Sequence, residues 1–140
     1  MKLIFCLDEK KGMMFGGKRQ SQDSVLRQWI MNKTKGSKLW MSSYSAKQFK
    51  DQTGFVVDDN YDSKAAPKDY CFVEDKEFSI EKADEVILCH WNRKYQADKA
   101  FDIDLKACGF RKTESEDIKG SSHEKISIEI FRRDQDEKKS

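Results

Sequence analysis

The sequence is short of the residues and patterns on which most recognisable catalytic sites depend. It has two histidines, one proline and seven glycines, and none of its four cysteines belongs to a Cys-x-x-Cys pair. It contains no Walker phosphate loop, no Gly-x-Gly-x-x-Gly fingerprint and no Gly-x-Ser-x-Gly elbow. Zinc sites use about four His, Cys or carboxylate ligands at short spacings, so we expect no metal site and exclude a His-rich metallohydrolase.

The sequence also lacks a large excess of basic or acidic residues, and it lacks long apolar runs. The 27 basic and 25 acidic residues leave a net charge of +2, which excludes a histone-like polycation. No run approaches the roughly 18 apolar residues of a membrane span. The first apolar run ends at Asp8, too early for the core of a signal peptide. We therefore expect a cytoplasmic protein without membrane contact, whose cysteines are reduced thiols.

Aromatic residues, in contrast, are plentiful enough to anchor a core. The chain has nine Phe, four Tyr and three Trp, and its length of 140 residues suits one domain. We expect that domain to cover residues 1–132, followed by a charged tail over 133–140.

Apolar runs and helical spacing alternate along the first half of the chain. Strands are predicted at 2–7, 38–41, 69–73, 85–91, 109–115 and 125–132, and helices at 20–31 and from 42 onward. Ser21 or Asp23 is expected to cap the first helix, and Ser43 or Ser45 the second. The alternation at 101–105 fits either an edge strand or a turn. The pattern predicts an α/β sheet that ends in an antiparallel hairpin.

The order of these segments resembles the dihydrofolate reductase family. The likeness is carried by ordered fragments at 2–8, 38–49, 82–91, 101–104 and 121–133. In the family a strand of the type Leu-Thr-His-Ile follows a Lys-Ala-Asp-like segment, as Leu88-Cys89-His90-Trp91 does here. The resemblance implies a single-domain mixed sheet with an antiparallel C-terminal hairpin. It also makes Asp23 the nearest match to the family's substrate carboxylate.

The departures from that family concern its chemistry. Cys89 stands where the family has the threonine that supports its carboxylate, and sulfur is a poor hydrogen-bond donor. The cofactor loop needs paired glycines after the third strand, but here that place reads Val73-Glu74-Asp75-Lys76-Glu77. Ser43 or Tyr44 replaces the arginine that reads the ribose phosphate. Two carboxylates would face the pyrophosphate, so we predict no cofactor and no binding of NADPH in the family manner.

Other polar clusters offer candidate ligand contacts. A basic and aromatic rim is expected from Lys18, Arg19, Trp91, Asn92 and Arg93. Asp23 and His90 are the candidate catalytic groups. Gly120 to Glu124 reads as a polar turn in which Ser122 and His123 need not interact, because neighbouring residues point different ways.

Three functions stay open at this point. The leading hypothesis is a non-reductase binding protein whose ligand is nucleotide-like, RNA or a protein partner. The second is an NADPH-dependent reductase, or a related pterin- or pyrimidine-processing enzyme, with Asp23 as proton relay. The third is an RNA-processing factor of ribonuclease type that lacks a zinc motif.

Overall fold

A seven-stranded sheet forms the body of the molecule. The computed structural model describes residues 1–133, so the predicted tail, apart from Arg133, lies outside the described residues. The strand order across the sheet is β5 (Val56–Val57), β4 (Leu39–Met41), β6 (Tyr70–Phe72), β1 (Lys2–Leu7), β7 (Glu85–His90), β10 (Ile126–Arg133) and β9 (Phe110–Ile118).

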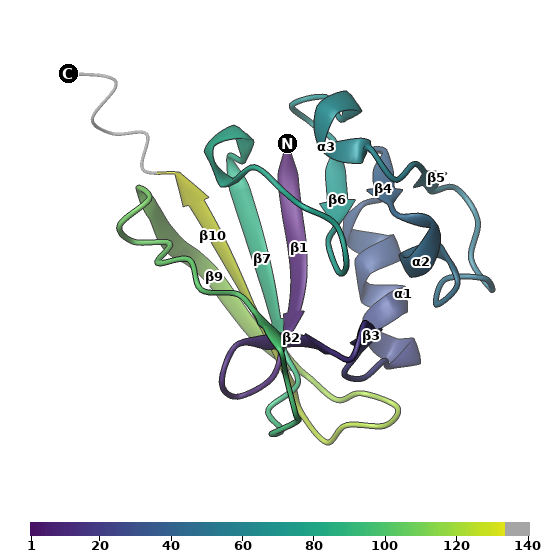
Figure 1. The fold of residues 1–140 in the computed structure, drawn as a ribbon, viewed down its shortest axis with the longest axis vertical. Helices are drawn as coiled ribbons and strands as arrows, with labels where there is room; N and C mark the ends of the chain where they lie inside the picture. Colours follow the sequence, from purple (N-terminus) through teal and green to yellow (C-terminus); the bar gives the residue numbers. More distant parts are fainter. Residues whose placement is uncertain (134–140) are drawn as a thin grey trace.

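Parallel strands occupy the centre of this sheet, and the antiparallel pair lies at one side (Figure 1). Leu3 of β1 stands opposite Cys71 of β6 and Val86 of β7, both in parallel register. β10 runs antiparallel to both β7 and β9. The predicted mixed sheet with an antiparallel C-terminal hairpin is confirmed. β10 includes Arg133, one residue beyond the predicted end of the domain.

A second, three-stranded sheet lies where the parallel strands end (Figure 1). It consists of β3 (Lys18–Arg19), β2 (Gly12–Phe15) and β8 (Lys99–Ala100). The sequence pattern predicts only a loop over residues 8–17. Two methionines of β2, Met13 and Met14, are buried, but the lysines and glycines around them give this segment no apolar pattern typical of a strand. The alternating segment 101–105 is not a strand.

Helices are few and short. α1 (Ser24–Lys33) is capped by Asp23, whose Oδ1 accepts from the Val25 and Leu26 amides. The other helical elements are α2 (Ser43–Ala46), α3 (Tyr61–Lys64) and the 3-10 turn η1 (Ile80–Lys82). α2 is capped by Ser42 and not by the expected Ser43 or Ser45. No helix among residues 1–133 is long and apolar enough to cross a membrane.

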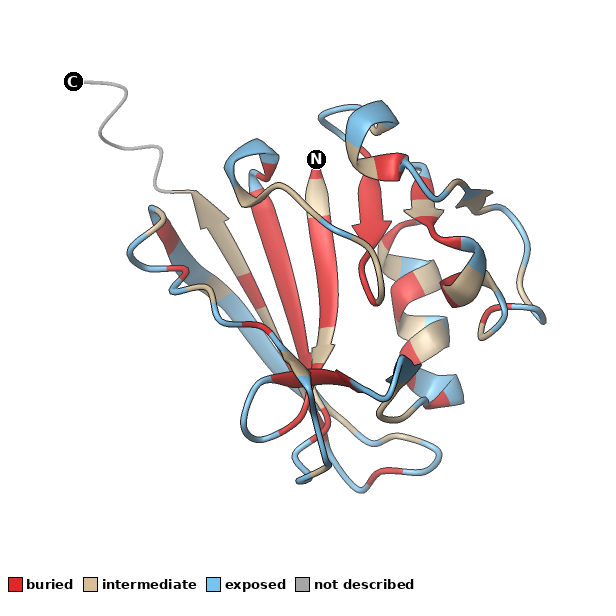
Figure 2. Cartoon of the chain, viewed as in Figure 1, coloured by how far each residue is buried: buried red, intermediate tan, exposed pale blue. Residues whose placement is uncertain are grey.

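Two apolar cores lie on opposite faces of the sheet, and the central strands are buried along their length (Figure 2). On one face Leu26 and Ile30 of α1 cover the sheet residues Ile4, Phe72, Ile87, Cys89, Ile128 and Ile130. On the other face the sheet is covered by Met13, Met14, Phe78, Phe101 and Leu105. Burial on both faces explains why the central strands read as unbroken apolar runs.

The Asp8 carboxylate organises the chain where β1 ends. Its Oδ1 accepts from the amides of Lys10 and Gly12, each at 2.8 Å. Its Oδ2 accepts from Gln20 Nε2 at 2.9 Å and from the Tyr95 amide at 3.3 Å. Burial by itself raises the pKa of Asp8, but the hydrogen bonds from Gly12 and Lys10 outweigh it, and the pKa is lowered overall. One charged side chain thus ties three segments together.

We predict that Asp8→Asn lowers the free energy of unfolding by about 1–3 kcal/mol. Asparagine has an NH2 group in place of one carboxylate oxygen, and this group cannot accept the two hydrogen bonds which that oxygen receives. Urea unfolding followed by circular dichroism measures the change. Asp98→Asn is the matched control, since exposed Asp98 accepts a single hydrogen bond, from Gly16. Equal losses in both variants would contradict an organising role for Asp8.

Candidate functional site

The start of α1 is joined to the loop before β10 by a buried carboxylate. Besides capping the helix, Asp23 Oδ1 accepts from the Ser121 amide at 2.9 Å, and Oδ2 accepts from the Ser122 amide at 2.8 Å. A Cβ added to Gly120 would lie 2.4 Å from Asp23 Oδ2, so only glycine fits beside it. Asp23, the nearest match to the family's substrate carboxylate, therefore has its oxygens already occupied by the protein itself.

His123 completes this arrangement. Its Nδ1 lies 2.9 Å from Asp23 Oδ2, and its Nε2 lies 2.9 Å from Ser21 Oγ and 3.3 Å from the Tyr95 hydroxyl. The indole ring of Trp91 stacks on the imidazole with the ring centroids 4.5 Å apart. The sequence suggested no partner for His123 within its own turn, and the structure supplies one from 100 residues away.

Hydrogen bonds keep Asp23 ionised despite its burial. Its side chain is 0% exposed, and that of His123 is 2% exposed. Removal from water alone raises the pKa of Asp23, but the hydrogen bonds from His123, Ser121 and Ser122 overcome this effect and hold the pKa far below its usual range.

A second cluster of polar groups lies where β4 and β6 end. Glu74, 7% exposed, receives two hydrogen bonds from Arg19, from Nε at 3.0 Å and from Nη2 at 3.1 Å. Ser45 Oγ donates to the same carboxylate at 2.8 Å, and Gln48 Nε2 donates at 3.1 Å. These three side chains thus donate to a carboxylate of the protein, in the segment where the resemblance expects paired glycines, and Lys99 Nζ donates to the Glu74 carbonyl at 3.1 Å.

Neighbouring contacts hold Arg19 and Asp75 in place. The Arg19 amide donates to the Tyr44 hydroxyl at 2.7 Å, and the guanidinium lies over the Tyr44 ring, 4.4 Å from its centroid. Ser42 Oγ donates to Asp75 Oδ1 at 2.7 Å. The hairpin of β2 and β3 is therefore fixed against α2 and the chain after β6.

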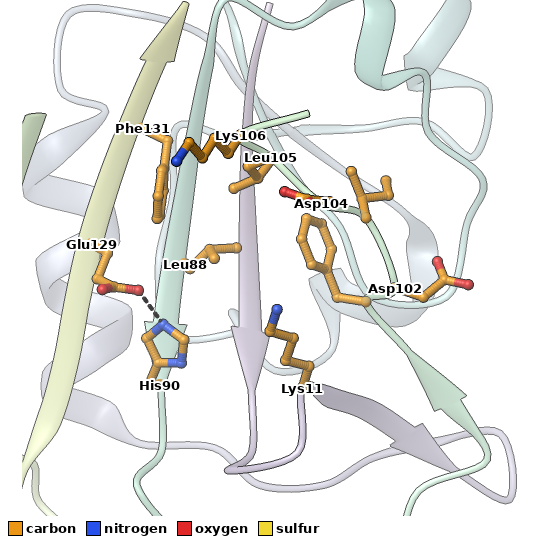
Figure 3. A pocket seen from close by; sticks show the side chains of 11 residues that line it. Lys11, Leu88, His90, Asp102, Asp104, Leu105, Lys106, Glu129 and Phe131 are labelled. Atoms are coloured by element: carbon orange, nitrogen blue, oxygen red, sulfur yellow. Dashed lines mark hydrogen bonds and ion pairs between the residues drawn. The ribbon is translucent and has the colours of Figure 1, made fainter. Parts of the chain in front are cut away.

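A cleft of about 510 Å³ opens on the sheet face opposite α1 (Figure 3). Its lining comes from β7, β10, the segment 101–106 and the turn after β1, and includes Leu88, His90, Glu129, Phe131, Phe101, Leu105, Lys106 and Lys11. His90 Nε2 donates to Glu129 Oε1 at 2.6 Å, and Lys112 Nζ donates to Glu129 Oε2 at 3.0 Å. Burial raises the pKa of Glu129, but these two donors lower it overall.

The residues of the predicted rim are spread over different surroundings. Lys18 is exposed, whereas Arg19 is bound to Glu74. Trp91 is only 3% exposed and packs on His123. Asn92 Nδ2 donates to Ser127 Oγ at 2.9 Å, and Arg93 Nη2 donates to the Ser122 carbonyl at 3.2 Å. Only Lys18 among them has its charged end free of a hydrogen bond within the described part of the chain.

The comparisons with known proteins bear on the fold alone. No protein-family model matches the sequence, and no curated protein matches it. A solved structure is similar, a dihydrofolate reductase from Enterococcus faecalis complexed with NADP(H) and RAB-propyl, with a TM-score of 0.66 over 95% of each chain. The chain has a dihydrofolate reductase-like fold. At 12% identity this likeness extends to the reductase-like fold and not to an activity.

Cys89, which stands where the resemblance expects the threonine that supports the family's carboxylate, makes no hydrogen bond to Asp23 in the structure of residues 1–133. The thiol is fully buried in the core with Leu26 and Ile30 of α1. Asp23 takes its hydrogen bonds from the helix and from residues 121–123 instead. Among residues 1–133, no group of three His, Cys, Asp or Glu side chains is arranged to hold a metal ion.

We predict that Asp23→Asn lowers the free energy of unfolding by about 1.5–3 kcal/mol near pH 7, because a buried charged acceptor is lost. The pKa of Asp23 is lower in the folded than in the unfolded protein, so its contribution is complete above about pH 4 and fades as the pH falls further.

Denaturant unfolding of both proteins between about pH 7 and pH 3 tests this prediction. The stability gap between wild type and Asp23→Asn should narrow on acidification. A gap of constant size would show that the charge of Asp23 contributes nothing.

Proposed function

We propose that this protein is a non-reductase binding protein and that its ligand is nucleotide-like, a flat ring carrying an anionic group. The observation that carries the proposal is the Glu74 carboxylate, which occupies the donors of Arg19, Ser45 and Gln48 after β6. In the reductase-like fold that segment is the one the resemblance assigns to the cofactor pyrophosphate.

Electrostatics supports the absence of NADPH binding there. A phosphate charge about 4 Å from a carboxylate costs about 4 kcal/mol at an effective dielectric constant near 20. Asp75, which has no ion pair among the described residues, would face the pyrophosphate, and the Arg19 guanidinium that could bind a phosphate is already paired with Glu74. Without the cofactor the hydride chemistry has no source.

The shape of the cleft on the other sheet face supports a small ligand over RNA or a protein partner. Its volume of about 510 Å³ lies within the usual range for small-molecule sites. Leu88, Leu105 and Phe131 form an apolar surface, here called the apolar bed, on which a flat ring can pack. His90 and Glu129 lie at one end of that bed, where a ring carrying donors and acceptors can reach them.

The charges around the cleft favour an anionic group on the ligand. Figure 3 shows the ammonium groups of Lys11 and Lys106 directed into the cleft from different sides, whereas the Asp102 carboxylate points away from it. Asp104 Oδ1 accepts from the Ala107 amide, and Glu129 is paired with His90 and Lys112. Lys11 and Lys106 therefore have ammonium groups without a hydrogen bond in the described part of the chain, while the Asp104 carboxylate keeps its negative charge.

Titration of the isotope-labelled protein with adenosine monophosphate, followed by amide NMR spectra, tests the proposal. Signals of Leu88, His90 and Glu129 should move, and those of Ser45 and Glu74 should stay in place. Inorganic phosphate alone should bind more weakly, because it lacks the ring that covers the apolar bed.

Charge-neutral variants sharpen this test. Lys106→Gln should weaken binding about tenfold, equivalent to about 1.4 kcal/mol. Lys35→Gln is the matched control, since Lys35 is an exposed lysine in the turn after α1 and does not line the cleft. Movement of the Glu74 signals, or equal weakening by both variants, would contradict binding in the cleft.

A further inference from the structure

Three side chains at the start of α1 form a chain of acid, imidazole and hydroxyl. Asp23 Oδ2 lies 2.9 Å from His123 Nδ1, and His123 Nε2 lies 2.9 Å from Ser21 Oγ. The two contacts use the two opposite nitrogens of one imidazole ring. Serine nucleophiles are activated by this connectivity on unrelated folds, so it is recognised by geometry and not by chain order.

The surroundings of His123 determine which nitrogen carries its proton. Asp23 is held as a carboxylate by the amides of Ser121 and Ser122, and a carboxylate only accepts. His123 Nδ1 must therefore carry hydrogen, and in the neutral imidazole the lone pair is then on Nε2, which faces the Ser21 hydroxyl. The Tyr95 hydroxyl also faces Nε2, but at the longer distance of 3.3 Å.

The three side chains of this site differ in how far they are exposed to solvent. Asp23 and His123 are shielded from water, with side chains 0% and 2% exposed, and Trp91 stacks on the imidazole to fix its plane. Ser21 is the half-buried member, next to the exposed Gln22. A reagent arriving from solvent therefore meets the hydroxyl first, and the general base lies behind it.

We propose that Ser21 is a nucleophile activated by His123 and positioned through Asp23, and that it cleaves acyl esters. Ser21 Oγ attacks the ester carbonyl carbon while its proton moves to His123 Nε2. The bond to the alcohol oxygen then breaks, and the departing alkoxide takes that proton. A water molecule repeats the sequence on the acyl-serine, releases the carboxylic acid and restores Ser21. This site is separate from the nucleotide-like ligand cleft and does not depend on it.

The experiment is covalent labelling of the folded protein with diisopropyl fluorophosphate, analysed by intact mass and peptide mapping. Ser21 Oγ forms a bond to phosphorus, the phosphorus–fluorine bond breaks, and the proton leaves with fluoride through His123. One adduct is expected, on Ser21. Asp23→Asn should label at least about 100-fold more slowly, because the imidazole loses the acceptor that sets its tautomer.

Control variants show whether Ser21 is labelled because His123 activates its hydroxyl or only because the hydroxyl is exposed to the reagent. Ser37→Ala removes an exposed serine whose hydroxyl makes no hydrogen bond among the described residues and should label like wild type, whereas Ser21→Ala should not label. Tyr95→Phe removes the competing hydroxyl, leaves Asp23 and His123 unchanged, and should label at least as fast as wild type; it tests the proposal even where Asp23→Asn fails to fold.

Three results would overturn the proposal: no adduct on Ser21, the same labelling rate in urea-unfolded wild type, or a rate in folded Asp23→Asn equal to that of wild type. Loss of labelling in Tyr95→Phe would also overturn it, because the hydroxyl of Tyr95 would then be the required group. Hydrolysis of p-nitrophenyl acetate that disappears in Ser21→Ala would extend the support from labelling to turnover.

Discussion

The ion pair between Arg19 and Glu74 is the interaction on which the arrangement at the ends of the parallel strands depends. Both groups are largely removed from water, with side chains 17% and 7% exposed. A buried charge left without its partner destabilises a protein by about 3–5 kcal/mol, so each of the two residues requires the other. Through this pair the β2–β3 hairpin, α2 and the chain after β6 behave as one unit.

The same pair lies in the segment where the resemblance expects the paired glycines of the family's cofactor loop. A reductase-like sheet brings the ends of β4 and β6 together, but here a carboxylate with its own arginine lies between them. At the start of α1, Asp23 is likewise satisfied by the protein, through His123 and the loop at 120–123. At both places the polar groups are paired within the protein, Glu74 with Arg19 and Asp23 with His123. The open cleft lies on the opposite face, around His90 and Glu129.

Local pattern is sufficient to predict the main strands and α1 and to limit its cap to Ser21 or Asp23, because short-range burial and capping decide these features. The β2–β3 hairpin does not follow from the local pattern, because lysines and glycines surround the buried Met13 and Met14, and because Arg19 is held by Glu74, 55 residues further on. The resemblance marks Glu74 as a departure from the family's cofactor loop, but the pairing of Glu74 with Arg19 follows only from the folded chain. The pairing of His123 with Asp23 spans 100 residues and likewise follows only from the folded chain.

The most direct test of the central claim is the melting temperature of the purified protein with and without a large excess of NADPH. A ligand that binds only the folded state at a hundredfold excess over its dissociation constant stabilises it by about 2.7 kcal/mol. For a chain of this size that corresponds to a rise of about 10 °C. The account predicts an unchanged melting temperature, because Glu74 and Asp75 occupy the phosphate end. A rise of about that size would contradict it and would favour a reductase.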